Sequence, residues 1–79
     1  MGARVPPMKY PNRVREFRQA AGMKPAELAF RTGLTEKTIE RIELGKHKPR
    51  LENGLAICRV LVRPIDVVFP SAEPAEVAS

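Results

Sequence analysis

Two groups of polar side chains between residues 35 and 50 have hydrogen-bond donors suited to a polyanion. The basic loop (residues 46–50, KHKPR) has four side chains that can donate to a phosphate. Lys37 and Arg41 lie four residues apart, so they would repel each other on an isolated helix, and a polyanion would relieve that repulsion. Lys37 could also donate to O6 and N7 of guanine. Glu36 and Glu40 oppose this interpretation, because carboxylates repel phosphates, and they need a separate explanation.

The sequence offers little for catalysis or for binding a metal. Because it has a single histidine, His47, and a single cysteine, Cys58, it cannot supply the usual four ligands of a Cys/His zinc site. It has no nucleophile–base pair and no glycine-rich phosphate-binding loop. We therefore predict that the protein is not an enzyme and needs no metal or cofactor. Cys58 cannot form an internal disulfide, and we expect it to be a small buried apolar residue.

Charge is distributed unevenly along the 79 residues, whose net charge is +5. Residues 12–50 carry ten basic and five acidic side chains, whereas residues 51–79 carry two basic and four acidic ones. This asymmetry favours an anionic partner on one face of the protein. No segment approaches the ~20 apolar residues of a membrane helix, and residues 1–12 lack the apolar centre of a signal peptide. We therefore expect a cytoplasmic protein with no membrane partner.

Helical periodicity and stop signals predict an all-α protein, a compact domain of five short helices without strands. The helices are expected at about residues 12–21, 25–32, 35–44, 51–61 and 64–69. Asn12 and Thr35 are candidate N-caps, and Gly22 and Gly33 are C-terminal stops. The predicted inward residues are Val14, Phe17, Ala21, Leu28, Ala29, Ile39, Ile42, Leu55, Cys58, Leu61, Ile65, Val68 and Phe69.

The two ends of the chain have no helical pattern. Residues 1–11 hold three prolines and are expected to form a flexible arm, within which Met8 is an alternative start to Met1. Residues 70–79 are rich in small and acidic residues and are expected to be a disordered tail. The ordered domain should therefore span residues 12–69.

The second and third expected helices are joined by a very short turn. Gly33 permits the positive φ that such a corner requires. Leu34 would fill the angle between the helices, and the small side chain of Ala29 would let them approach closely. This set is typical of a helix-turn-helix, whose second helix enters the major groove of DNA. A plain two-helix corner in an all-α core is the alternative.

Residues 12–69 resemble the phage-repressor/Cro-type (Xre-like) helix-turn-helix family. The matching pieces, in the family's order, are R-V-x-x-F-R, A-x-G-M, x-E-L-A, T-G-L-T-x-x-T-I-x-R-I-E-x-G-K, K-P, L-x-x-x-L-x-I and I-D-x-V-F. The resemblance implies a five-helix, lambda-repressor-like DNA-binding domain. It also implies a homodimer that binds double-stranded DNA at a near-palindromic operator.

The resemblance assigns roles to individual residues. The family's base-contacting positions fall on Thr35, Glu36, Lys37, Thr38, Glu40 and Arg41. The family also places the basic loop along the DNA backbone, which makes Lys46, His47, Lys48 and Arg50 candidates for phosphate contacts, and Arg13 and Lys24 are further candidates. Arg18 and Glu43 match an ion pair that ties the first helix to the end of the third. An ordinary solvated surface is the alternative for both charged groups.

The resemblance also gives an account of the two glutamates of the expected third helix. Family members commonly have an acidic residue where Glu40 lies. Glu36 could accept a hydrogen bond from cytosine N4. Alternatively, it only stabilises the start of the helix through the helix dipole.

Five residues depart from the family's pattern, and one of them, Asn53, lies where an apolar residue is common. Lys24 replaces a Ser or Thr N-cap worth about 1 kcal/mol, and Pro25 replaces a Gln that donates to a phosphate. Gly54 lies inside the expected fourth helix, at a cost of about 1 kcal/mol relative to Ala. Val62 replaces the usual glycine after that helix, and because a β-branched residue is poor in a left-handed turn, we expect this turn to be built differently.

We therefore predict a small dimeric transcription regulator that binds specific double-stranded DNA, with repression as the expected mode. Residues 35–44 would form the helix in the major groove. The alternative is an antitoxin or another protein-binding adaptor that uses the same fold and has a protein partner.

Overall fold

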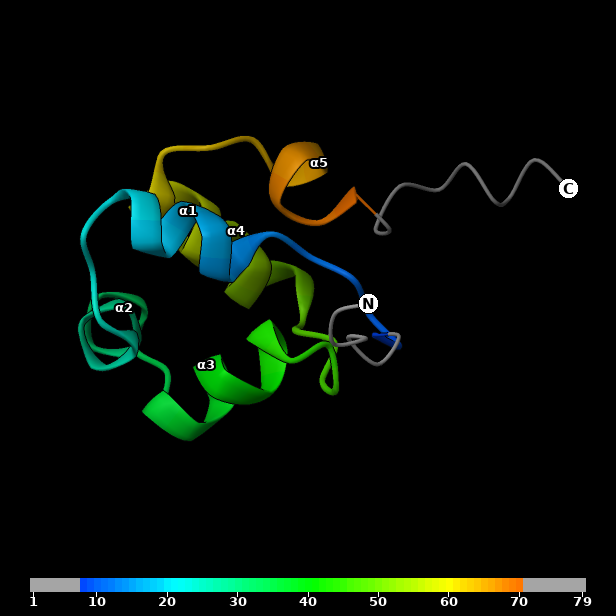
Figure 1. Ribbon diagram of the computed structural model, residues 1–79, viewed down its shortest axis with the longest axis horizontal. Helices are drawn as coiled ribbons and strands as arrows, with labels where there is room; N and C mark the ends of the chain where they lie inside the picture. The colour runs from blue at the N-terminus through cyan, green and yellow to red at the C-terminus, as the bar shows by residue number, and fades with distance from the viewer. Residues whose placement is uncertain (1–7, 71–79) are drawn as a thin grey trace, which may run out of the picture.

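The computed structural model describes residues 8–70, and this part of the chain forms five helices and no strand (Figure 1). The helices are α1 (Val14–Ala20), α2 (Pro25–Thr32), α3 (Glu36–Glu43), α4 (Leu51–Leu61) and α5 (Ile65–Val68). Each lies within the range that the sequence predicts, and the all-α prediction is confirmed for the described residues. The expectations for residues 1–7 and 71–79 lie outside this part of the chain.

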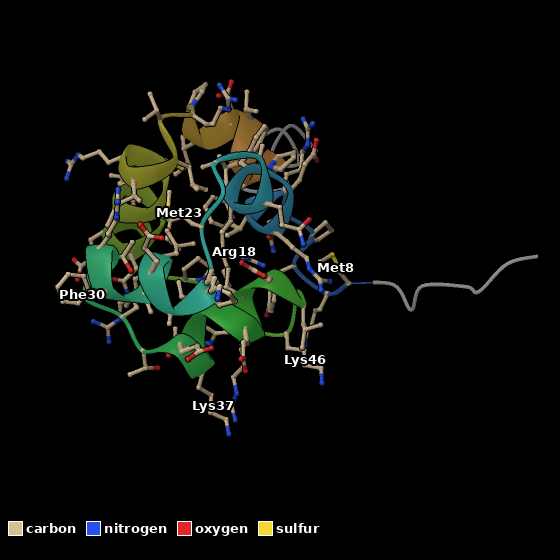
Figure 2. All side chains as sticks on the ribbon, turned by 60° about the vertical axis from the view of Figure 1, so that its left-hand side comes forward. Met8, Arg18, Met23, Phe30, Lys37 and Lys46 are labelled. Carbon is tan, nitrogen blue, oxygen red and sulfur yellow. The ribbon has the colours of Figure 1, made fainter. Side chains whose placement is uncertain are left out.

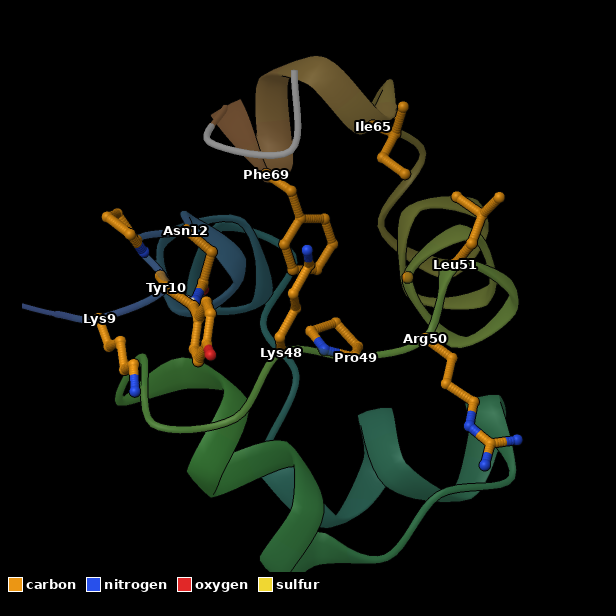
Figure 3. A pocket seen from close by; sticks show the side chains of 11 residues that line it. Lys9, Tyr10, Asn12, Lys48, Pro49, Arg50, Leu51, Ile65 and Phe69 are labelled. Atoms are coloured by element: carbon orange, nitrogen blue, oxygen red, sulfur yellow. Dashed lines mark hydrogen bonds between the residues drawn. The ribbon is translucent and has the colours of Figure 1, made fainter. Parts of the chain in front are cut away.

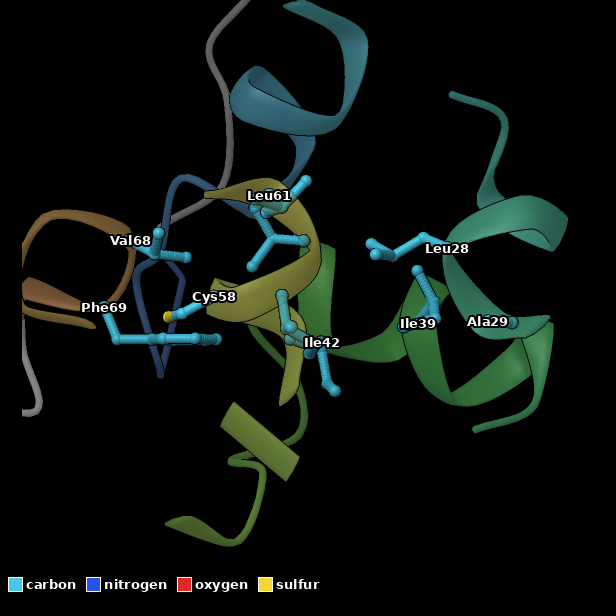
Figure 4. Packing of buried hydrophobic residues seen from close by; sticks show 10 residues of the cluster. Leu28, Ala29, Ile39, Ile42, Cys58, Leu61, Val68 and Phe69 are labelled. Atoms are coloured by element: carbon cyan, nitrogen blue, oxygen red, sulfur yellow. The ribbon is translucent and has the colours of Figure 1, made fainter. Parts of the chain in front are cut away.

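All five helices surround one hydrophobic core, which the residue after α5 completes (Figure 4). Its buried members are Val14, Leu28, Ala29, Ile39, Ile42, Ile57, Cys58, Leu61, Val68 and Phe69. Phe17 and Ile65 are half-buried against this core, as is Leu34 in the turn between α2 and α3. Burial raises the pKa of the Cys58 thiol and so favours its neutral form.

Two of the predicted core residues, Ala21 and Leu55, are exposed instead. Ala21 lies beyond the last residue of α1, so the helical periodicity does not carry it inward. In α4 the buried positions are Gly54, Ile57, Cys58 and Leu61, a spacing of three, four and seven residues that defines one helix face. Leu55 lies outside that face and is 39% exposed.

The turn between α2 and α3 has the backbone conformation predicted for a helix-turn-helix. Gly33 adopts a left-handed conformation at φ 78°, and the backbone N–H of Leu34 donates to the carbonyl of Ala29 at 3.0 Å. Thr35 caps α3, because its hydroxyl oxygen accepts a hydrogen bond from the backbone N–H of Thr38 at 3.1 Å. These local bonds fix the start of α3 relative to α2.

The turn after α4 is left-handed despite its valine, so the expectation of a turn built differently is wrong. Val62 is left-handed, with φ 57° and ψ 49°, and the backbone N–H of Arg63 donates to the carbonyl of Cys58 at 3.1 Å. The Val62 side chain is 78% exposed, so little packing offsets the unfavourable conformation. The strain of a residue held in this region is on the order of 1 kcal/mol.

Replacing Val62 with glycine is therefore expected to raise the free energy of unfolding by about 1 kcal/mol, because glycine adopts a left-handed conformation without strain. Urea denaturation followed by circular dichroism measures the change. Val60→Gly is the matched control, since Val60 lies inside α4 and packs against the core. A loss of stability in both variants would contradict the strain at Val62.

Candidate nucleic-acid interface

The outer face of α3 brings most of the predicted base-contacting residues together. Ile39 and Ile42 are fully buried on the inner face, which leaves Glu36, Lys37, Glu40 and Arg41 exposed on the other side. Helix α3 lies at the edge of the molecule, opposite α5 (Figure 1), and Lys37 projects away from the domain (Figure 2). This face is therefore accessible to a large partner.

The two threonines at the start of α3 bond to each other. The Thr35 hydroxyl donates to the Thr38 hydroxyl oxygen at 2.9 Å, in addition to capping the helix. Thr38 is half-buried and acts only as an acceptor in this pair, so its own O–H can still donate to a base or a phosphate. The pair orients the first turn of α3.

The candidate phosphate-binding cations do not all lie together. Lys46 projects to the same side of the domain as Lys37 (Figure 2), and His47 is also exposed. Lys48 extends instead toward Phe69, over a pocket, while the Arg50 side chain points away from Phe69 (Figure 3). The basic loop thus presents charge in more than one direction.

The other two candidate cations precede helices. Lys24 is exposed at the N-terminus of α2 and forms no side-chain cap, as the sequence indicates. Arg13, before α1, donates to both carboxylate oxygens of Glu16 at 2.9 Å and lies 4.8 Å from the centroid of the Phe17 ring. The hydrogen bond raises the pKa of Arg13 and lowers that of Glu16. The positive charge of Arg13 is therefore already balanced by the carboxylate of Glu16.

Arg18 and Glu43 meet inside the domain and join α1 to the end of α3. Two guanidinium nitrogens of Arg18 donate to the two carboxylate oxygens, at 2.7 and 3.1 Å, and a third donates to the carbonyl of Met23 at 2.8 Å. The two side chains are only 7% and 8% exposed. The hydrogen bond to Glu43 raises the pKa of Arg18. This pair fixes α3 against the body of the protein.

A second connection holds the end of α3, and local sequence patterns do not predict it. The N-terminal strap (residues 8–12) crosses the turn after α3, where the Tyr10 N–H donates to the carbonyl of Gly45 at 3.0 Å. The Asn12 amide donates to the carbonyl of Ile42 at 2.7 Å. Met8 packs so closely that a Cβ on Gly45 would lie 2.5 Å from its own Cβ. The strap therefore positions both α3 and the basic loop.

Asn12 also begins α1, but not as the predicted N-cap. The helix starts two residues later than expected, and the Asn12 side-chain oxygen accepts from the N–H of Val14 at 3.0 Å. The same amide group thus serves α1 with its oxygen and α3 with its nitrogen.

Asn12→Ala is expected to lower the free energy of unfolding by about 2 kcal/mol, because the partly buried carbonyl of Ile42 loses its side-chain donor. Thermal unfolding measures the loss. Asn12→Asp keeps the acceptor for Val14 but removes the donor for Ile42. If the aspartate variant were as stable as the original chain, the connection to α3 would contribute nothing.

A sequence model of the helix-turn-helix family matches residues 14–68, which include all five helices. This chain belongs to the Cro-type helix-turn-helix family. Proteins of this family are DNA-binding transcription regulators rather than a class of enzyme. The α2–α3 pair, joined at Gly33, has the geometry of a helix-turn-helix.

The relatives of this helix-turn-helix chain are named as transcriptional regulators. Two uncharacterized HTH-type transcriptional regulators of Archaeoglobus fulgidus are 40% and 39% identical to it over 57 residues, which are 72% of this chain and 81% and 80% of those proteins. Among solved structures, the restriction-modification controller protein C.AhdI from Aeromonas hydrophila matches with a TM-score of 0.68 and 32% identity. That match covers 72% of this chain and 86% of C.AhdI. Within residues 8–70, no helix is long and apolar enough to cross a membrane.

Proposed function

We propose that the protein is a cytoplasmic transcriptional repressor that binds a near-palindromic operator as a homodimer, with α3 in the major groove. The observation that carries this proposal is the outer face of α3. It exposes Lys37 and Arg41 at the edge of the domain, with Lys46 projecting to the same side (Figure 2). Lysine and arginine donors in this arrangement suit guanine edges and the adjoining phosphates. Glu36, at the N-terminal end of α3, would accept from cytosine N4.

Helix α4 supplies a surface that supports self-association. Val62, at its C-terminal end, is 78% exposed, and Leu55 is 39% exposed. Leu55 and Val62 also line a shallow depression of about 390 Å³ beside α5. Burying these apolar side chains against a second copy would remove them from water. In the resulting dimer, two α3 helices would be available for two half-sites.

Selection from a random duplex DNA library at about physiological salt tests the proposal. We expect recovery of a palindrome whose half-sites lie about one helical turn, or ~34 Å, apart. A cytosine opposite Glu36 would also support its proposed contact. Recovery of no motif would contradict selective DNA binding by the chain alone and would favour the alternative, an antitoxin or adaptor with a protein partner, for which co-purification is the next experiment.

The basic loop gives a second prediction, about salt. Replacing Lys46 and Lys48 together with alanine is expected to weaken binding to all DNA sequences alike and to make the slope of log K against log salt shallower by about 0.9, because Lys46 projects to the same side as Lys37 whereas Lys48 extends toward Phe69. Fluorescence anisotropy with a non-operator duplex measures the slope. Arg15→Ala is the control, because Arg15 is an exposed cation of α1 without a predicted role at DNA. A slope equal to that of the original chain would place both lysines outside the interface.

A further inference from the structure

A pocket of about 710 Å³ lies where the N-terminal strap, the basic loop, α4 and α5 meet (Figure 3). Tyr10 lies on one side, Leu51 and Ile65 lie on the other, and the ring of Phe69 faces the space between them. The side chain of Lys48 extends toward that ring. The volume falls within the range of about 300–1,000 Å³ that is usual for small-molecule sites.

The polar groups of this pocket favour an anion. Lys9, Lys48 and Arg50 line it, and its lining includes no aspartate or glutamate. Within residues 8–70, neither the Lys48 side chain nor the Arg50 side chain has a hydrogen bond or ion pair to another residue. The opposite wall, formed by Leu51, Ile65 and Phe69, is apolar. The pocket thus combines the unpaired positive charge of Lys48 with an apolar surface, which is the complement of an amphipathic anion.

Gly54 gives independent support, because the fold does not require a glycine at this position. It lies inside α4 with no positive φ, where glycine is less favourable than alanine. A Cβ at Gly54 would meet Phe69 at 3.7 Å and Ile65 at 3.9 Å, which are ordinary contacts that the core could accept. Those two neighbours line the pocket, as Gly54 itself does. The missing side chain keeps space open beside the apolar wall.

We propose that this pocket binds a small organic monocarboxylate with an aryl or alkyl body. The body packs among Leu51, Ile65 and Phe69, and the carboxylate pairs with Lys48. The ligand contacts the N-terminal strap and the basic loop, and the strap bonds to Gly45, the residue that joins α3 to that loop. Occupancy therefore changes the affinity for DNA. This last consequence rests on the proposed function, whereas binding of the ligand does not.

Titration of the full chain with 2-naphthoate in the absence of DNA, followed by ¹H–¹⁵N NMR, tests the site. We expect saturable shifts at Tyr10, Gly54 and Phe69 with a Kd on the order of 1 mM. The neutral analogue 2-naphthamide should bind about fivefold more weakly, because it lacks the charge that pairs with Lys48. Absence of saturable shifts, or equal affinity for the amide, would overturn the proposal.

Three variants locate the ligand. Gly54→Ala should raise the melting temperature by about 4 °C while weakening 2-naphthoate binding, a combination that loss of folding cannot produce. Lys48→Ala should weaken binding about fivefold, and the matched variant Lys46→Ala should leave it unchanged, since Lys46 does not line the pocket. Unchanged binding in Gly54→Ala, or equal effects of the two lysine variants, would remove the ligand from this pocket.

The regulatory consequence has a separate readout. Adding 2-naphthoate to the complex with the selected operator should change the Kd for DNA in the original chain, and Lys48→Ala should need about fivefold more 2-naphthoate for the same change. If the NMR titration succeeds and the DNA affinity stays constant, the coupling to α3 is wrong. If the chain selects no operator, the proposed function fails while the ligand titration stands.

Discussion

Arg18→Ala is expected to lower the free energy of unfolding by about 3 to 5 kcal/mol, which is enough to unfold much of the protein at 37 °C. The guanidinium of Arg18 donates to both oxygens of Glu43 and to the carbonyl of Met23. Its removal leaves a carboxylate that is 8% exposed without its cation. Circular dichroism during urea denaturation measures the loss.

The exposed pair of Arg31 and Glu27 is the matched control. It has the same short distance of 2.7 Å between nitrogen and oxygen, but its side chains are 53% and 43% exposed. Arg31→Ala should therefore cost less than about 1 kcal/mol. Replacing Arg18 with Met and Glu43 with Leu together should recover much of the stability, because no buried charge remains unpaired. Equal losses for Arg18→Ala and Arg31→Ala would show that burial of the first pair has little effect.

The helices and the turn between α2 and α3 could be predicted because their signals are local. Gly33, Leu34 and Thr35 lie within three consecutive positions, and their roles depend on backbone conformation and on hydrogen bonds to near neighbours. The spacing of Ile39 and Ile42 likewise identifies the buried face of α3 without knowledge of its neighbours. Such features need only a few residues to be specified.

Two of the errors, at Leu55 and Val62, concern positions where distant parts of the chain decide the outcome. Leu55 and Ile57 are both apolar residues of α4, and only the placement of α4 against the other helices selects Ile57 for the core. Val62 occupies a left-handed conformation because α4 must turn back toward α5, whatever the residue's own preference. At both Leu55 and Val62, the packing of the helices outweighs the preference of the residue itself.

The candidate interface shows the same division. The residues that α3 exposes follow from its periodicity, but the strap that holds its C-terminal end does not. Asn12 and Ile42 are 30 positions apart, and nothing near either residue indicates that they bond. The direction of Lys48, toward Phe69 rather than alongside Lys46, also depends on the arrangement of the loop against α5. Their positions in the sequence therefore place Lys46 and Lys48 in one group, whereas the fold directs their side chains to different places.

Replacing Lys37 and Arg41 together with alanine is expected to weaken binding to the selected operator by at least about thirtyfold. A good contact between a side chain and a base edge contributes about 1 to 3 kcal/mol of discrimination, and the variant removes two such donors. Both side chains are exposed and neither forms an ion pair within the described residues, so the melting temperature should change little. Competition between the operator and a scrambled duplex at fixed salt separates lost specificity from lost charge.

Glu36→Gln makes the complementary control, because it removes a negative charge from the same face of α3 while keeping an acceptor oxygen. The amide should raise affinity for all DNA sequences, since a carboxylate beside phosphates is unfavourable. It should also weaken the preference for cytosine over the other bases at the contacted position, since the glutamine side chain can donate as well as accept. If operator affinity were unchanged in both variants, α3 would not lie in the major groove, and its charged face would be a solvated surface or a site for a protein partner.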